Sequence, residues 1–489
     1  MRLRRSRHRC HRGPDYDRWQ AEALAAWEQA GRIGIIEAVT GSGKTHVAIE
    51  ALARLHAQDR WLNTVVIVPT LPLMEQWYEK LTRSRRFPDD RVGRIGGRYR
   101  EIFTIPPLAY VMTVQSALHH APELLRHCWD PSFEGRYKSF LIADECHHYI
   151  DAPVWKKIIR PPYEWTYRMG LSATIEPYEV DGLGKIVMTY SFRDAYRDRL
   201  VPSFDLLNVG VDLTAPESER YLDLSDKIRE QWRRVFKEYR YELRYVPDHW
   251  SFRELQRLMG KLGSGKEPEI ERLFLLLFKR AEIHYMAEYK MNLAERTVAQ
   301  FAAAGRKTLV FFERIAAADW VNDNVPLRAA KCLQGRLASN PQVWCRTYHS
   351  GMDRKERDRV LEEFRTQKSG ALLACRSLDE GVDVPDVDGA VLIASTQAAR
   401  QRIQRIGRTL RRGNGCKRPI IVTLFAKGTG DEGVTRNDQA EFQDVACIHD
   451  IGASECSALV QGLLRGKRPR RLSESTGVGC EVDQHMCAY

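Results

Sequence analysis

Residues 37–48 read EAVTGSGKTHVA, and this stretch decides the fold of the segments around it. An apolar run, IGIIEAV, ends just before the glycines, and a stretch with helical periodicity, HVAIEALARLHAQ, follows them at 46–58. Glycine lets the backbone fold around a phosphate group, and the amino end of a helix offers N–H donors and partial positive charge to an anion. The stretch therefore predicts a strand–loop–helix unit that binds phosphate.

The residue types in this loop suit a nucleoside triphosphate and its metal ion. Lys44 would reach the β- and γ-phosphates, and the Thr45 hydroxyl would ligate Mg²⁺. One departure from the usual G-x-x-x-x-G-K-T pattern is Ala38, which stands where the first glycine is expected. We predict ATP and Mg²⁺ as cofactors, with nucleotide contacts from Thr40, Gly41, Ser42, Gly43, Lys44 and Thr45.

A second motif, LIADECHHYID at 141–151, has two interpretations. Its carboxylate, thiolate and imidazole groups, including Cys146, could bind a transition metal. It could equally be the end of a buried strand, with Asp144 holding Mg²⁺ and Glu145 accepting a proton from the attacking water. Adjacent ligands point in different directions, and no C-x-x-C or H-x₃-H pair lies nearby in the sequence. The second interpretation is therefore favoured.

Short apolar runs alternate with helical stretches in two separate series, which is the pattern of α/β domains with parallel sheets. Such domains place their sites at the carboxyl ends of the strands. The strands expected in the first series are 33–39, 63–70, 109–115, 139–145 and 167–174, and those in the second are 307–313, 346–350, 370–376, 389–395 and 418–425.

These series divide the chain into five expected segments. They are a basic N-terminal arm (1–13), a first α/β domain (14–202), a linker strand with a helical insertion (203–300), a second α/β domain (301–445) and a basic, largely disordered tail (446–489). In the insertion, DHWSFREL (248–255) and RAEIHYMAEYKMN (280–292) mix aromatic with basic residues. They could stack on bases, but a packed core of the insertion is favoured.

Composition indicates a globular chain whose clustered positive charge is either a solvated face, the usual interpretation of a single charge run, or the surface for a polyanionic partner. The chain has 489 residues, of which 43% are hydrophobic and 29% charged, and its net charge is +12. Arginine is concentrated at 2–12, 400–412 and 465–471, which favours nucleic acid as the partner. No apolar run approaches the ~20 residues of a membrane span, and the basic N-terminus lacks the apolar core of a signal peptide. We expect a cytoplasmic protein, associated with the nucleoid in a bacterium, that is not secreted and does not contact membranes.

The eleven cysteines form no C-x-x-C pair, so reduced thiols are expected. HRCH (8–11) and CEVDQHMC (480–487) could be fragments of zinc sites, but incidental residues are favoured because neither holds a complete set of ligands.

The order of the motifs over roughly residues 14–430 resembles that of superfamily 2 helicases and translocases, with DECH in place of the DEAD box. The resemblance implies two RecA-like domains with ATP bound between them. The motifs that carry it, beside the two described above, are DRWQAEAL (17–24), IVPTLPLMEQW (67–77), GRIGGR (93–98), MTVQSAL (112–118), GLSATI (170–175), LVFFERI (309–315), YHSGM (348–352), SLDEGVDVPDVDGAVL (377–392) and QRIGRTLR (404–411).

The resemblance also implies roles for single residues. Gln20 would read the adenine edge, and Gly381 and Asp383 would touch the nucleotide from the second domain. Ser172 and Thr174 would couple the state of ATP to the grip on nucleic acid, with Cys146 and His147 linking them to the ATP site. The catalytic residues would be Lys44, Glu145, Gln404, Arg408 and Arg411, with both arginines reaching the phosphates from the second domain. Nucleic-acid contacts would come from Thr70, Gly97, Gln115, Ser350 and Ser377.

Among these relatives, SLDEGVDVP at 377–385 resembles the branch that holds the repair helicase XPB and the motor subunits of restriction enzymes. The resemblance implies an ATP-dependent DNA helicase or translocase in repair, recombination or defence against foreign DNA, with a nuclease, methyltransferase or repair protein as partner. One alternative is an RNA helicase. Another is a subunit whose ATP cycle gates assembly without strand separation. A relative that binds nucleic acid without hydrolysis is disfavoured, because the catalytic residues are intact.

Overall fold

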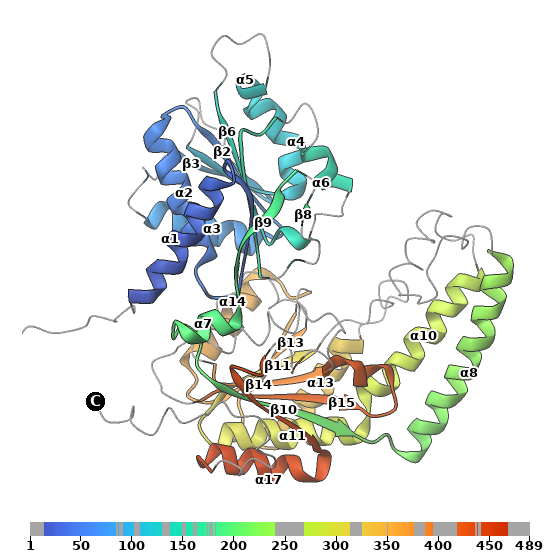
Figure 1. Cartoon of the computed structure of the whole chain (residues 1–489). Helices are drawn as coiled ribbons and strands as arrows, with labels where there is room; N and C mark the ends of the chain where they lie inside the picture. The colour runs from blue at the N-terminus through green and yellow to red at the C-terminus, as the bar shows by residue number, and fades with distance from the viewer. Residues whose placement is uncertain are drawn as a thin grey trace, which may run out of the picture.

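The computed structural model describes most of the chain, and it shows two α/β domains with a helical hairpin extending to one side (Figure 1). No helix in the described part of the chain has the length and apolar character needed to cross a membrane. The described residues are 14–84, 87, 91–101, 108–129, 137–148, 153–159, 164–173, 175, 179–180, 182–239, 268–312, 325–349, 351–375, 387–394, 418–435, 438 and 442–467.

The first domain is built on a sheet with the order β4-β3-β5-β2-β6-β7-β1-β9-β8. Its five central strands confirm the first predicted series: β1 (Ile33–Ala38), β2 (Asn63–Val68), β5 (Ala109–Thr113), β6 (Ser139–Asp144) and β7 (Tyr167–Ser172). The strands that sequence reasoning missed are β3 (Val92–Gly96), β4 (Tyr99–Arg100), β8 (Glu179–Val180) and β9 (Gly184–Tyr190). β3 and β4 pair antiparallel, as do β8 and β9, whereas all other pairs are parallel.

Helices cover both faces of this sheet, because successive side chains of a strand point to opposite faces. On β1, Ile36 packs into the cluster under α1, α2 and α3, and Ile35 packs into the cluster under α4 and α6. On β2, Val66 packs into the first of these clusters and Val65 packs into the second. The helices are α1 (Pro14–Gln29), α2 (Lys44–Gln58), α3 (Leu71–Arg83), α4 (Val114–Leu124), α5 (Arg126–Trp129), α6 (Pro153–Ile158) and α7 (Phe192–Arg197), with a 3₁₀ turn at Cys146–His148.

The second domain is built on a parallel sheet with the order β12-β13-β11-β14-β15-β10-β16. Five of its strands confirm the second predicted series: β11 (Lys307–Phe312), β12 (Cys345–His349), β13 (Gly370–Cys375), β14 (Gly389–Ala394) and β15 (Ile420–Ala426). Helices α11 (Glu288–Ala303), α13 (Val325–Leu337) and α17 (Ala453–Leu464) cover one face, and α14 (Arg354–Thr366) covers the other.

Two predicted boundaries of this domain need correction. The expected linker strand, β10 (Phe204–Val211), lies inside the second sheet between β15 and β16 (Ala446–Gly452). The prediction of a disordered tail from residue 446 is wrong for residues 446–464, because β16 pairs with β10 from Phe204↔Ala446 to Gly210↔Gly452, and α17 follows it. β16 was missed because it is an edge strand whose side chains are half-buried or exposed and form no long apolar run.

The predicted helical insertion is confirmed as a hairpin of α8 (Ala215–Glu238) and α10 (Pro268–Met286), which stands away from the sheets (Figure 1). Val235 of α8 and Leu273 of α10 are completely buried in the cluster between the two helices. The packed-core interpretation of 280–292 is confirmed for Tyr285, which lies in that cluster, whereas Met291 is buried in the core of the second domain and Tyr289 is exposed. The stretch 248–255 lies outside the described residues.

A group of aromatic rings joins the two domains at α7. Phe192 at the start of α7 lies 5.4 Å from the ring of Phe442, and Phe442 lies 5.7 Å from Phe204 of β10. Beside these rings, Arg193 forms an exposed ion pair of 2.6 Å with Asp444. The chain therefore leaves the first sheet through α7 and enters the second sheet at β10 across a common apolar contact.

Candidate active site

The glycine-rich loop lies between β1 and α2, as the sequence predicts, and takes a conformation that requires glycine. Gly41 and Gly43 have φ angles of +86° and +94°, which residues with a Cβ atom adopt at a cost. The hydroxyl groups of Thr40 and Ser42 are buried and have no hydrogen-bond partner among the described residues. Buried unpaired donors are costly unless a ligand satisfies them, so the loop is suited to the oxygen atoms of a phosphate group.

Lys44, the first residue of α2, folds back over the loop. It is 8% exposed, and its ammonium group donates a hydrogen bond of 2.7 Å to the carbonyl oxygen of Ala38. Ala38 replaces the expected glycine without strain, because it is an ordinary strand residue at the end of β1 with a buried side chain. The ammonium group is thus held at the mouth of the loop, where it can exchange the carbonyl for a phosphate oxygen.

Asp144 lies at the carboxyl end of β6 and is buried. The indole Nε1 of Trp77 donates a hydrogen bond of 2.6 Å to Asp144 Oδ2, and the backbone N–H of Glu145 donates one of 3.0 Å to Oδ1. Burial, and next the charge of Glu145, raise the pKa of Asp144 to about 6, against the lowering effects of Trp77, Lys44 and Lys80. Two neutral donors therefore orient the carboxylate.

The residues around Asp144 fit a hard divalent cation. Thr45 supplies a hydroxyl oxygen and Asp144 a carboxylate, which are the ligand types that Mg²⁺ prefers. The Nζ atom of Lys80 donates a hydrogen bond of 3.2 Å to Thr45 Oγ1, so a cationic group already contacts one proposed ligand. No group of three or more His, Cys, Asp and Glu residues within the described ranges is arranged to hold a metal ion, and the zinc fragments lie outside those ranges.

Glu145 follows Asp144 in a left-handed backbone conformation, with φ +45°, which is rare for a residue other than glycine. Such strain costs of order 1 kcal/mol and is concentrated at functional sites. Glu145 Oε2 lies 3.6 Å from His147 Nδ1, which in turn lies 2.9 Å from the Ser172 hydroxyl at the end of β7. The proposed base is thus connected by side-chain contacts to the GLSATI motif.

Glu37, the residue before Ala38, connects the same motif to the phosphate loop. Its carboxylate accepts a hydrogen bond of 2.8 Å from the backbone N–H of Ile175 and one of 3.2 Å from Thr189. Glu37 is a site residue that could not be expected from the sequence, because a single acidic residue within an apolar strand does not reveal its partner.

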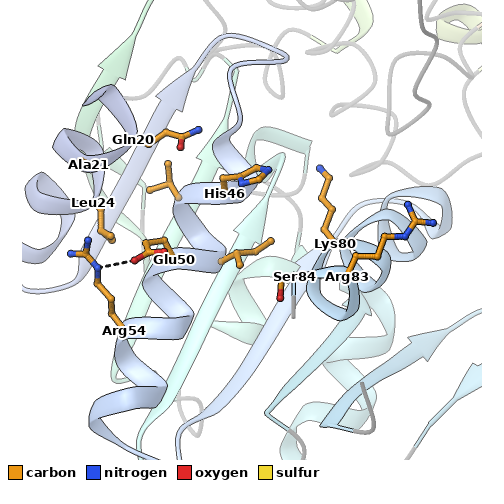
Figure 2. A pocket seen from close by; sticks show the side chains of 11 residues that line it. Gln20, Ala21, Leu24, His46, Glu50, Arg54, Lys80, Arg83 and Ser84 are labelled. Atoms are coloured by element: carbon orange, nitrogen blue, oxygen red, sulfur yellow. Dashed lines mark hydrogen bonds and ion pairs between the residues drawn. The ribbon is translucent and has the colours of Figure 1, made fainter. Parts of the chain in front are cut away.

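Gln20 lies on α1 and lines a pocket of about 690 Å³ between α1, α2 and α3. Its neighbour Trp19 stacks on Tyr190 with the ring centroids 4.4 Å apart, which fixes this part of α1 against β9. Figure 2 shows Gln20 and His46 at one side of the pocket and Lys80 and Arg83 of α3 opposite them. The pocket adjoins the phosphate loop because α2 begins at that loop, so its position is compatible with a nucleotide base.

Three of the predicted nucleic-acid contacts share one edge of the first sheet. Thr70 follows β2 and occupies the N-cap position of α3 without a side-chain capping bond, Gly97 lies in the turn between β3 and β4 with φ +57°, and Gln115 is exposed at the start of α4 after β5. β3, β5 and β2 are parallel neighbours, with Val68 level with Thr113. Their carboxyl ends therefore bring the three residues to a common surface.

The remaining predicted residues, all but Thr174 from the second half of the chain, lie outside the described residues. They are Thr174, Ser350, Ser377, Gly381, Asp383, Gln404, Arg408 and Arg411. Their proposed roles stay predictions.

Trp77 and Lys80 are site residues that sequence reasoning missed. They are three residues apart on α3, so they lie on one face of the helix and reach Asp144 and Thr45 respectively. The spacing was visible in IVPTLPLMEQWYEK, but a buried tryptophan at helical spacing is usually a core residue, and nothing in the sequence shows which carboxylate it meets.

Two family models match the chain and cover its two domains separately. The model described as type III restriction enzyme, res subunit, matches residues 15–177, and the helicase conserved C-terminal domain matches residues 290–413. The order and position of the two domains agree with the two sheets of the structure.

Two curated relatives and one solved structure are similar over most of the chain. The DNA 3'-5' translocase XPB2 of Sulfurisphaera tokodaii is 27% identical over 429 residues, covering 86% of this chain and 83% of the relative. The putative DNA 3'-5' helicase Rad25 of Halobacterium salinarum is 26% identical over 83% of this chain, but only 53% of the relative is covered. Saccharomyces cerevisiae Dbp5, solved bound to RNA and ADP BeF3, superposes with a TM-score of 0.54 at 15% identity, over 91% of this chain and 93% of Dbp5. The fold is that of superfamily 2 helicases.

Proposed function

We propose that this chain, a superfamily 2 helicase by its two matched domains and its fold, couples ATP hydrolysis to movement along DNA. The observation that carries the proposal is the meeting of Lys44, Thr45 and Asp144 around a loop with unpaired buried hydroxyl groups, in the same domain as the edge that holds Thr70. A phosphate site and a candidate strand-binding edge on one sheet are what a translocating ATPase needs.

The residues divide the chemistry among them. Lys44 leaves the Ala38 carbonyl to hold the β- and γ-phosphates, and Thr45 with Asp144 would hold Mg²⁺, which neutralises phosphate charge when bound. Glu145, with its side chain only 20% exposed, would orient the attacking water and accept its proton. Arg408 and Arg411 would reach the phosphates of ATP from the second domain. Their positive charge would be in place only when the two domains come together, so the rate of hydrolysis would depend on the relative position of the domains.

DNA is favoured over RNA by the relatives and not by the fold. The two relatives named above are a DNA translocase and a DNA helicase, and the family model of the first domain belongs to a restriction enzyme. The similarity to Dbp5, which was solved with RNA, shows that this fold accommodates either polymer. Strand contacts through phosphate oxygens, as proposed for Thr70 and Gly97, do not by themselves select the sugar.

The test is ATP hydrolysis by the purified chain with single-stranded DNA, duplex DNA and RNA of matched length and salt concentration. We expect stimulation by DNA, and equal salt is required because phosphate contacts make binding salt-dependent. Stimulation by RNA alone would overturn the choice of DNA. Absence of nucleotide hydrolysis under all three conditions would overturn the proposal itself.

A second candidate function is an ATP-gated subunit that assembles with a nuclease or methyltransferase and separates no strands. The match of the first domain to a restriction-enzyme subunit favours this alternative. Displacement of a labelled strand by the purified chain alone would exclude it. DNA-stimulated hydrolysis without displacement or translocation would favour it over the helicase.

A further inference from the structure

Helix α3 reaches the proposed metal site with two side chains. Its N-terminal residue follows Thr70, on the edge proposed to bind nucleic acid, and its buried face carries Leu73, Met74 and Leu81 into the core. On the side toward β6 and α2, Trp77 donates to Asp144 and Lys80 donates to Thr45. Both proposed Mg²⁺ ligands are therefore contacted by the same helix, one turn apart.

The two contacts differ in chemistry. Trp77 is 1% exposed and neutral, so it orients Asp144 without supplying charge. Lys80 is exposed and cationic, and beyond its contact with Thr45 its charge acts on Asp144, whose pKa it lowers. The Lys80 ammonium group thus contacts the hydroxyl that would ligate the metal ion, and its charge, with that of Lys44, favours the ionised form of the carboxylate.

An ammonium group and a divalent cation cannot share these ligands without repulsion. A lysine head group donates hydrogen bonds to the same oxygen lone pairs that a metal ion would use. Like charges a few ångströms apart repel appreciably even near a protein surface. The Lys80 side chain has a long flexible stem and lines the open pocket shown in Figure 2, so it has space to swing away from Thr45.

We propose that Lys80 is a resident cation of the Mg²⁺ site: it holds the Thr45 hydroxyl in the absence of metal, and Mg²⁺ displaces it on binding. The inference rests on the proposed function, because it takes Thr45 and Asp144 as the metal ligands. Lys80 is a positioning residue in this scheme. It sets how much Mg²⁺ is required to load the site, and its charge adds to that of Lys44 in favouring the ionised form of Asp144.

The experiment titrates nucleotide-free protein with Mg²⁺ alone and follows two signals. The first is tryptophan emission, since metal binding at Asp144 changes the charge beside the Trp77 indole; Trp77→Phe identifies that component among the eleven tryptophans. The second is the thermal unfolding temperature as a function of Mg²⁺, which does not depend on Trp77. Lys80→Met removes the charge and keeps most of the stem, and Lys80→Arg keeps the charge.

The matched control is Arg83→Met. Arg83 lies one turn further along α3, lines the same pocket and pairs with Glu79 at 3.4 Å. We expect Lys80→Met to lower the Mg²⁺ concentration at half-saturation by about tenfold, while Lys80→Arg and Arg83→Met stay within about twofold of the wild type.

The outcomes separate this inference from the proposed function. If the wild type responds to Mg²⁺, Asp144→Asn abolishes the response and Lys80→Met titrates like the wild type, only the resident-cation proposal is overturned. If the wild type shows no Mg²⁺ response by either signal, the nucleotide-free site does not load Mg²⁺ and the resident-cation proposal is overturned, whereas the proposed function is still decided by the hydrolysis test. If Lys80→Met leaves the Mg²⁺ midpoint unchanged but weakens binding of ADP without metal, Lys80 is a phosphate ligand, and the proposal is again overturned.

Discussion

The imidazole Nδ1 of His147 lies 2.9 Å from the hydroxyl Oγ of Ser172, and the two groups form a hydrogen bond. The same nitrogen lies 3.6 Å from Glu145 Oε2. Ser172 is completely buried at the end of β7, one strand away from the phosphate loop on β1. His147 therefore contacts both Glu145, which is proposed to activate water, and the GLSATI motif, which is proposed to couple the state of ATP to the grip on nucleic acid.

We therefore expect His147→Ala to reduce strand displacement more than ATP hydrolysis. His147 carries no proposed chemical step, so the variant should hydrolyse ATP within about tenfold of the wild-type rate but displace several-fold fewer strands per ATP. Both quantities are measured in one reaction. If the hydrogen bond carries the effect, the double variant His147→Ala/Ser172→Ala will displace as many strands per ATP as the more impaired of the two single variants. Additive losses would show that the two residues act separately.

Lys44→Ala should abolish ATP hydrolysis. The change removes the only charge that the loop itself offers to the β- and γ-phosphates, and a lost charge contact in a phosphoryl-transfer site costs roughly 10²-fold or more in rate. Hydrolysis is measured at saturating nucleotide and DNA. The control is Lys185→Ala, which removes an exposed lysine at the amino end of β9. The phosphate loop follows the carboxyl end of the parallel strand β1, so this change should leave the rate unchanged. Full activity of Lys44→Ala would remove the phosphate-loop assignment.

Glu145→Gln should bind ATP but not hydrolyse it. Glutamine keeps the size of the side chain and the backbone N–H donated to Asp144, but it cannot accept a proton from water. The variant should therefore retain a nucleic-acid-bound state with ATP, detected as slow release of labelled DNA. Loss of ATP binding in a folded Glu145→Gln protein would contradict the division of labour between Asp144 and Glu145.

The first-domain site was predictable because its residues are close together in the sequence or end apolar strands. Gly41 to Thr45 follow β1, and Asp144 ends β6, so chain order and the parallel sheet already bring them to one edge. The contacts that position these residues come from elsewhere in the sequence. Trp77 is 67 residues from Asp144, and Glu37 is 138 residues from Ile175. Helical or strand periodicity identifies such residues as buried but not their partners.

The strands that were missed share a physical cause. β16 has no fully buried residue, and β9 is exposed or half-buried except at Tyr190, so neither shows a continuous apolar run. β10, by contrast, is buried at every position, but its place between β15 and β16 depends on pairing across more than 200 residues. Sequence periodicity therefore indicates strand formation more reliably than strand order.

The stability of the metal-free protein should depend on the ionisation of Asp144. Burial, and next the charge of Glu145, raise the pKa of this carboxyl from 3.8 to about 6, so the folded state favours its protonated form. The stabilising contribution is complete below about pH 4 and is lost as pH rises through about 6, with a total change of about 3 kcal/mol.

Asp144→Asn removes this ionisation and keeps an oxygen that accepts from Trp77. Without Mg²⁺, the variant should equal the wild type in unfolding free energy near pH 4 and exceed it above about pH 6. Urea unfolding at a series of pH values measures the difference. A difference that does not change between these pH values would show that Asp144 has an ordinary pKa in the folded protein.

The base of the helical hairpin depends on a buried ion pair between Lys290 of α11 and Asp431 in the 3₁₀ turn after β15. The two side chains are 0% and 3% exposed, and Asp431 also accepts a hydrogen bond of 3.1 Å from the backbone N–H of Ala426. Removing one partner of a buried pair leaves the other charge uncompensated, so Lys290→Met should lower the unfolding free energy by roughly 3–5 kcal/mol. Urea unfolding followed by circular dichroism measures the loss.

The double variant Lys290→Met/Asp431→Asn tests the cause of that loss. Asparagine carries no charge and keeps an acceptor for the Ala426 N–H, so the double variant should recover more than half of the lost stability. The comparison is Lys227→Met, which breaks an exposed pair of 2.6 Å with Asp223 and should cost less than about 1 kcal/mol. If Lys290→Met costs no more than Lys227→Met, or if the double variant is less stable than the single one, the uncompensated charge of Asp431 is not what destabilises the protein.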